Sequence, residues 1–181
     1  MLLSGARLIC RDGFDVARVA DIVSHGEASV GAFYQRFGDK HGLLAALRRE
    51  LELSSIRGIR RFFSGVPSGG DPLRMLERLV VTIDRSVRRR RRLIAAMVSA
   101  NGRDAPRGST WQAIEEALGE ALIPWSTRGR SLAVRAQRSR LAAASLLQMV
   151  VMHALLDPPD VERLDRGRVR TIVDMHARYL Q

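Results

Sequence analysis

Residues 14–44 read FDVARVADIVSHGEASVGAFYQRFGDKHGLL, the pattern of two short amphipathic helices joined by a tight turn and followed by the start of a third. In the first helix, Val19, Ile22 and Val23 have the i, i+3, i+4 spacing of one buried stripe. Asp15 stands ahead of this stripe as a candidate N-cap, because its side chain can accept a hydrogen bond from the first turn. The segment therefore predicts a helix-turn-helix.

The second helix of this motif has one apolar side and one side that is expected to be accessible. Gly26 ends the first helix, and Ser29 is positioned to cap a second helix of about two turns. Its apolar side carries Phe33 and Phe37. The remaining side chains are expected to face outward or flank the seam: Val30, Ala32, Tyr34, Gln35 and Arg36. A helix of this kind fits the major groove, so the segment predicts DNA binding.

More than ten residues of this region have a characteristic order and spacing, with no insertion or deletion between them. They are Gly13-Phe14-Asp15, Val19, Asp21-Ile22, Ser29, Gly31, Phe33-Tyr34, Phe37, Lys40 and Leu43-Leu44. In this order they resemble the N-terminal domain of the tetracycline-repressor (TetR) family of transcriptional regulators. The remainder of the chain is similar to that family only in length and helical character. Family members commonly carry a basic arm before their first helix, whereas this chain begins inside it, so we expect its true start to lie upstream of Met1.

The resemblance assigns phosphate contacts to the second helix of the motif and to the start of the next helix. These contacts fall to Tyr34, Arg36 and Lys40, because a hydroxyl group and two cations suit phosphate oxygens. Arg18 opens the first helix of the motif, where it is expected either to reach a phosphate or a guanine edge or to pair with a neighbouring aspartate.

Base reading is assigned to three other side chains of the second helix. Gln35 is suited to adenine, whereas Val30 and Ala32 can only touch a thymine methyl group. A solvent-facing position is the alternative for Gln35. We therefore expect sequence preference to rest partly on DNA shape.

Apolar spacing along the whole chain predicts an all-α fold of about nine helices. Beyond the two helices of the motif, the predicted helices cover residues 2–11, 40–59, 72–87, 93–100, 109–125, 130–156 and 165–180. Asp39 is positioned to cap the helix that follows it, and Pro124 must bend or end another. We expect a helix-turn-helix DNA-binding domain at residues 1–47 and a helical ligand-binding and dimerisation domain at residues 48–181.

Seven residues of the C-terminal part are candidates for lining the regulatory pocket that the resemblance implies. They are Met75, Met97, Trp111, Trp125, Met149, Met152 and His153. Methionine and tryptophan tolerate varied apolar ligands, so we expect a small, predominantly apolar ligand, aromatic and neutral or anionic, with His153 as a polar handle. Ordinary core packing is the alternative for each of these residues.

The helices expected at residues 130–156 and 165–180 carry wide apolar stripes, and the family pairs such helices as a four-helix bundle. The interface candidates are Leu147, Val151, Ile172 and Val173. The resemblance thus implies a homodimeric repressor of a palindromic double-stranded operator, which a small apolar ligand releases. The half-site centres of this operator are expected roughly 34–36 Å apart or somewhat more. The alternative is a DNA-binding protein of the same fold that a protein partner or its own abundance controls, without a small-molecule inducer.

The net charge of +11 supports DNA binding only weakly, because residues 1–47 hold five basic and five acidic side chains. Twenty-nine of the thirty basic residues are arginines, which indicates codon bias before phosphate recognition. The run from Arg88 to Arg92 would spread around the helix and cannot form one stripe, so we interpret it as a solvated helix end in preference to the alternative, a second DNA site.

Several classes of protein are disfavoured by what the sequence lacks. Cys10 is the only cysteine, which excludes an intrachain disulfide and favours a reducing cytoplasm, and the family resemblance implies that of a bacterium. We expect Cys10 on the buried stripe of its helix. No segment reaches the roughly 20 apolar residues of a membrane span, so we expect no membrane contact. Scattered histidines and the absence of a phosphate-binding glycine loop predict neither an enzyme nor a bound metal or cofactor.

Overall fold

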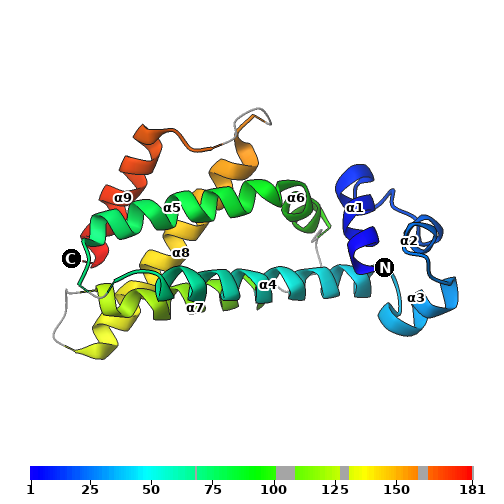
Figure 1. The fold of residues 1–181 in the computed structure, drawn as a ribbon, viewed down its shortest axis with the longest axis horizontal. Coiled ribbons are helices and arrows are strands. Elements are labelled where there is room, and N and C mark those ends of the chain that lie inside the picture. The colour runs from blue at the N-terminus through cyan, green and yellow to red at the C-terminus, as the bar shows by residue number, and fades with distance from the viewer. Residues whose placement is uncertain (68, 101–108, 127–130, 159–162, 181) are drawn as a thin grey trace. The chain divides into compact units, whose positions relative to one another are not determined.

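The computed structural model describes residues 1–67, 69–100, 109–126, 131–158 and 163–180. Within these residues the chain forms nine α-helices and one 3-10 turn and contains no strand, which confirms the predicted all-α fold. The elements are α1 (Leu2–Asp12), α2 (Val19–His25), α3 (Val30–Phe37), α4 (Lys40–Ser64), α5 (Pro72–Arg89), α6 (Arg91–Ser99), α7 (Ser109–Leu122), η1 (Ile123–Trp125), α8 (Leu132–Leu156) and α9 (Arg166–Leu180) (Figure 1).

Local sequence signals decide where several helices end and begin. α7 stops two residues before Pro124 and continues into the 3-10 turn η1, so the predicted break at this proline is confirmed. Ser131 caps α8, because its side chain accepts a hydrogen bond from the backbone N–H of Val134 at 3.3 Å. The predicted start of this helix at Arg130 lies outside the described residues.

The first of two compact units comprises Met1–Leu53 and Arg90–Thr110. α2 packs against α1 and α3, and α6, which is distant in the sequence, packs against α1. The largest buried side chains of this unit are Ile9, Ile22, Phe33, Leu43, Leu44 and Ile94. The helix-turn-helix therefore shares a core with α1, the first turns of α4 and α6.

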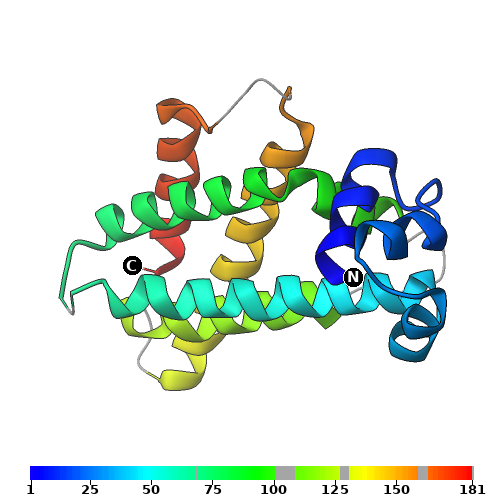
Figure 2. The ribbon, with the colours of Figure 1, turned by 45° about the vertical axis from the view of Figure 1, so that its right-hand side comes forward.

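The second unit comprises Ser54–Arg89 and Trp111–Gln181. α5 packs against α8 and α9, and these two helices pack against each other (Figure 2). α8 has the length and apolar composition of a membrane span, and 44% of its most apolar window is buried inside the protein. Its contacts with two neighbouring helices are those of a core helix.

A buried ion-pair network joins three segments of the second unit. Arg88 donates from Nε to Asp84 at 2.7 Å and from Nη2 to Asp157 at 2.6 Å. Asp157 also accepts a hydrogen bond from Arg168 of α9 at 2.7 Å, and Asp84 accepts one from the backbone N–H of Leu164 at 3.1 Å. The network thus connects α5, the residue after α8 and the segment that leads into α9.

This network corrects the interpretation of Arg88–Arg92 as a solvated helix end. The Arg88 side chain is only 8% exposed, because two carboxylates from separate segments accept its guanidinium hydrogens. The hydrogen bond from Arg88 holds the pKa of Asp157 below the usual aspartate value. The interpretation therefore does not hold for Arg88, whereas Arg89 and Arg92 are exposed.

Candidate functional site

The candidate DNA-recognition helix, α3, is fixed at both ends by local contacts. Ser29 has extended backbone angles, and its Oγ accepts a hydrogen bond from the N–H of Ala32 at 3.1 Å, which confirms the predicted cap. Gly38 ends the helix at a φ of 74°, where glycine is favoured, and donates its N–H to the carbonyl of Tyr34. Phe33 is completely buried and anchors α3 to its unit.

The opposite side of α3 is accessible, as the sequence pattern predicts. Val30 is 48% exposed and Tyr34 is 51% exposed, and Gln35 and Arg36 are exposed beside them. Ala32 is half-buried. α3 therefore presents one hydroxyl, one amide, one cation and small apolar groups to solvent, and groups of these kinds can contact phosphates and base edges.

Arg18 is the residue that precedes the first turn of α2. Its backbone is extended and no side chain caps the helix there, so the prediction that Asp15 is the N-cap is wrong. The cap position falls three residues later than Asp15 because the chain makes a turn between α1 and α2. Arg18 is exposed, and within the described part of the chain no ion pair joins it to Asp15 or Asp21.

Lys40 has a structural role that sequence reasoning missed. Its Nζ donates a hydrogen bond to the carbonyl of Asp15 at 3.1 Å and lies 4.7 Å from the ring centroid of Phe14. These contacts tie the link between α1 and α2 to the first residue of α4. The ammonium group has three hydrogens, so this hydrogen bond leaves donors for a phosphate.

Cys10 is half-buried, which corrects its expected place on the buried stripe of α1. The buried side of this helix consists of Gly5, Leu8 and Ile9, which face the rest of the unit. Partial burial raises the pKa of the Cys10 thiol, so the protonated form dominates near neutral pH and the sulfur is a weak nucleophile.

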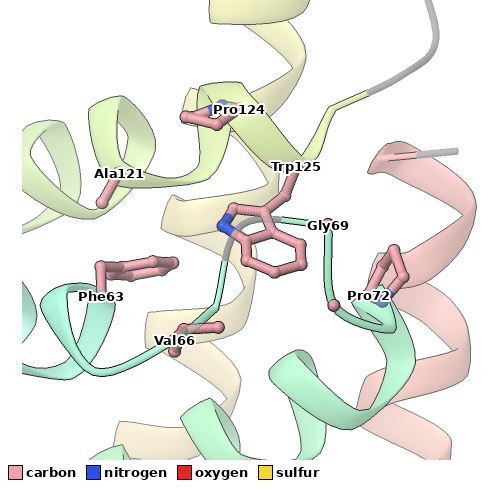
Figure 3. Close-up of a pocket in the computed structure, with 8 residues that line it drawn as sticks. Phe63, Val66, Gly69, Pro72, Ala121, Pro124 and Trp125 are labelled. Carbon is pink, nitrogen blue, oxygen red and sulfur yellow. The ribbon is translucent and has the colours of Figure 1, made fainter.

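Trp125 lines a pocket of about 400 Å³ in the second unit (Figure 3). The pocket is formed by the end of α4, the link to α5 and the end of α7. Its other lining residues are Phe63, Val66, Gly69, Gly70, Pro72, Ala121 and Pro124. None of the eight lining residues has an ionisable side chain, so this pocket suits an uncharged apolar group.

Three other candidates line a second pocket, also of about 400 Å³, along α8. Met149, Met152 and His153 lie there, together with Ser145, Gln148 and Leu156. Met152 is 46% exposed and Leu156 is 74% exposed, so this surface is open to solvent.

The remaining candidate ligand residues lie elsewhere. Met75 is 2% exposed and belongs to the core side of α5, and Trp111 is half-buried on α7. Met97 is buried in the first unit, where its carbonyl accepts a hydrogen bond from Arg48. The structure therefore does not bring the seven candidates together in one cavity.

The four candidate interface residues lie inside the chain's own packing. Leu147, Val151, Ile172 and Val173 are each at most 9% exposed, on the sides of α8 and α9 that face the second unit. The same two helices expose other large apolar side chains: Leu141, Met152, Leu156, Met175 and Tyr179. A second copy of the chain could contact these exposed side chains and not the four buried ones.

His176 joins α9 to α8 just below that exposed surface. Its Nδ1 lies 2.6 Å from the carbonyl of Ile172 and its Nε2 lies 3.1 Å from the Ser145 hydroxyl. A carbonyl only accepts, so Nδ1 carries the hydrogen and Ser145 donates to Nε2. Burial lowers the pKa of His176, which favours this neutral form.

Groups of three or more histidine, cysteine, aspartate or glutamate side chains that could hold a metal are absent from the described residues.

Residues 2–47 match the family model of bacterial regulatory proteins, tetR family. No curated protein matches the chain. Among solved structures, the TetR family repressor AlkX from Dietzia sp. strain DQ12-45-1b, implicated in biodegradation of n-alkanes, is 21% identical, with a TM-score of 0.66 over 99% of this chain and 95% of that one. PfmR, a TetR family transcriptional regulator from Thermus thermophilus, is 20% identical, with a TM-score of 0.63 over 99% of this chain and 98% of that one. The fatty acid degradation regulator FadR from Bacillus halodurans is 16% identical, with a TM-score of 0.61 over 99% and 95%.

The likeness to these structures covers both units of the chain and shows the fold. The match of residues 2–47 covers α1, α2, α3 and the first turns of α4, and so includes the capped helix with the accessible face. Residues 2–47 are thus a domain of the bacterial regulatory proteins, tetR family, and the whole chain has the fold of the TetR family regulators that it resembles.

Proposed function

We propose that the protein is a homodimeric repressor that binds a palindromic operator and leaves it when a small apolar ligand binds. The observation that carries the proposal is the accessible side of α3, because a buried phenylalanine and a serine cap fix a short helix that exposes four side chains opposite its buried side. In this proposal residues 1–47 bind DNA and residues 48–181 dimerise and bind the ligand.

The proposed DNA contacts divide into two kinds. Arg18, Tyr34, Arg36 and Lys40 contact phosphates and set the position of α3 in the major groove. Val30, Ala32 and Gln35 contact base edges, with Gln35 as the one side chain suited to a bidentate bond with adenine. Four of these seven side chains are exposed on one short helix, which supports a common contact surface.

Replacing Arg36 or Gln35 with alanine is expected to separate the two kinds of contact. Arg36→Ala should weaken binding to all duplexes and reduce the salt slope of log K by about 0.9, the contribution of one phosphate contact. Gln35→Ala should leave that slope unchanged and cost about 1–3 kcal/mol of discrimination at one base pair per half-site. Fluorescence anisotropy over a range of salt concentrations measures both, once selection from random duplexes has supplied the operator.

Arg170→Ala is the matched control for Arg36→Ala, because it removes an exposed arginine from α9 and changes the net charge equally. Equal salt slopes for Arg36→Ala and wild type would exclude the phosphate contact. An operator without inverted symmetry would contradict the dimeric arrangement.

Dimerisation is proposed to use the exposed apolar side chains of α8 and α9, above the buried Leu147, Val151, Ile172 and Val173 that support them. Met152→Glu is expected to convert the dimer to a monomer at micromolar concentration, because it buries a carboxylate without a partner. Light scattering gives the mass. Leu73→Glu, at a similarly exposed leucine of α5, is the control that should stay dimeric. A monomeric wild-type protein would remove the proposal.

The proposed ligand site is the pocket at Trp125, because it is apolar and its lining lacks ionisable groups. Titration with N-phenyl-1-naphthylamine, a neutral aromatic probe, is expected to quench Trp125 fluorescence and to release operator DNA over the same concentrations. Trp125→Phe should abolish the quenching, whereas Trp111→Phe should preserve it.

The charge of the ligand is tested with two further probes of similar size, one anionic and one cationic. We expect the neutral probe to bind best, since an ion would enter a lining without a counter-charge. If none of the three probes quenched Trp125 or released DNA, control by a protein partner or by abundance would become the better account. The candidate ligand residues lie at separate sites, and this observation supports the alternative of a DNA-binding protein without a small-molecule inducer.

A further inference from the structure

Four exposed arginines, Arg74, Arg78, Arg85 and Arg89, follow one side of α5. They are separated by four, seven and four residues, so at about 100° per residue they stay within one narrow band of the helix surface. The other side of α5 carries the buried core residues that pack against α8 and α9. We name these four residues the arginine stripe.

Little negative charge balances the arginine stripe. Arg74 lies 3.7 Å from Asp71, and both side chains are largely exposed, so this pair is weak. Within the described residues, no ion pair involves Arg85 or Arg89, and Glu77 is the one exposed acidic residue of α5. The stripe therefore carries a net positive charge toward solvent.

The density of net positive charge is high in the same region. Residues 54–89 contain eight basic and three acidic side chains, whereas residues 1–53 contain seven of each. The excess is therefore not a uniform property of an arginine-rich chain. Residues 54–89, which include α5, carry +5 of the net charge of +11, and the remaining +6 is spread over the longer segment of residues 90–181.

The spacing of the stripe fits a duplex of nucleic acid. At a rise of about 1.5 Å per residue, arginines four residues apart stand about 6 Å apart along the axis, and the stripe is about 22 Å long. The phosphates of one DNA strand recur about every 3.4 Å along the duplex axis, so each arginine can meet a separate phosphate. Guanidinium groups bind phosphate oxygens in a bidentate manner. α5 has no aromatic side chain, and the ring of Phe62, 5.9 Å from the Arg78 guanidinium, is half-buried. The stripe therefore lacks the series of exposed rings on which successive unpaired bases stack, which favours a double strand over a single strand.

We propose that the arginine stripe is a second DNA-binding surface, which contacts the phosphates of duplex DNA without regard to base sequence. It requires neither α3 nor an operator. Its effect is to add a salt-dependent affinity for any duplex to the sequence-specific binding that α3 is proposed to supply.

The test uses the full-length protein carrying Gln35→Ala and Arg36→Ala, so that α3 contributes little to binding. In this background all four arginines of the stripe are replaced by glutamine, and affinity for a random-sequence duplex is measured by anisotropy between low and physiological salt. The control variant replaces four exposed arginines on α8, α9 and the segment before α9, so that it loses the same net charge: Arg140, Arg163, Arg166 and Arg170. Circular dichroism melts confirm that both variants fold.

The stripe variant is expected to bind the duplex about tenfold more weakly at low salt, and the slope of log K against log salt concentration is expected to fall by about three units. For the control variant, this slope is expected to change by less than about one unit. Equal losses in the two variants would mean that net charge alone acts, and the proposal would fail. An unchanged stripe variant would also overturn it. If polyglutamate displaced the protein from this surface as well as duplex DNA does, an acidic protein segment would be the partner instead. Operator recognition by α3 is read separately from the Arg36→Ala and Gln35→Ala single variants, so either proposal can fail alone.

Discussion

Replacing Arg88 with methionine is expected to lower the free energy of unfolding by about 3–5 kcal/mol, because it leaves the buried Asp84 without a cation and leaves Asp157 with only the half-exposed Arg168. Arg88 is 8% exposed and hydrogen-bonds Asp84 at 2.7 Å and Asp157 at 2.6 Å. Methionine is flexible and fills much of the same space, so the loss reports the unpaired charges more than a cavity. Urea unfolding followed by circular dichroism, at one fixed protein concentration, measures it.

Arg89→Met is the matched control for this prediction. Arg89 is the next residue of α5 and is exposed, so the same chemical change there should alter the free energy of unfolding by no more than about 0.5 kcal/mol. Similar losses in the two variants would show that the network contributes no more than a surface arginine does.

The pH dependence of the Arg88→Met effect follows from Asp157. The hydrogen bond from Arg88 lowers the pKa of this carboxyl in the folded state, so its contribution to stability is fully present above about pH 4. It is lost as the pH falls through the lowered pKa, where the folded carboxylate becomes protonated as well. The difference in stability between wild type and Arg88→Met is therefore expected to shrink on acidification. A constant difference from pH 7 to pH 2 would be inconsistent with this linkage.

The elements that the sequence predicts correctly depend on residues close together in the chain. Ser29 caps α3 through an N–H three residues away, and Asp39 caps α4 through the N–H of Gly42 at 2.7 Å, as their positions suggest. Pro124 ends α7 because it lacks an amide hydrogen. The accessible face of α3 follows from the same local periodicity, so the main part of the candidate DNA site is predictable.

The elements that the sequence does not predict depend on contacts between distant residues. Lys40 donates a hydrogen bond to the carbonyl of Asp15, 25 residues away in the sequence, and Arg88 donates one to the carboxylate of Asp157, 69 residues away. Periodicity shows that Leu147 and Ile172 lie on a buried side of their helices, but it cannot distinguish a second copy of the chain from the chain's own helices as the surface that covers them. For the same reason methionine and tryptophan indicate apolar surroundings without indicating which of them share a cavity.

Two glycines of the same helix, α4, are expected to respond in opposite ways to alanine. Gly42→Ala should destabilise the first unit by about 3 kcal/mol and abolish operator binding, because the new Cβ would overlap the carbonyl oxygen of Phe37 at the end of α3. This neighbour is backbone and cannot move aside as a side chain could. The same turn holds the Asp39 cap, so any shift also strains the N-terminus of α4.

Gly58→Ala is the matched control, and it is expected to raise the free energy of unfolding by about 1 kcal/mol. Gly58 is exposed in the interior of α4, and a Cβ there would meet nothing within 4 Å, so the change only removes the entropic cost of a helical glycine. Urea unfolding measures the effect of each substitution on the stability of the whole chain. Hydrogen exchange of the α3 amides measures its effect on the first unit. If Gly42→Ala unfolded at the same urea concentration as Gly58→Ala and kept its affinity for DNA, the close approach of α3 and α4 would not be what holds the recognition helix in place.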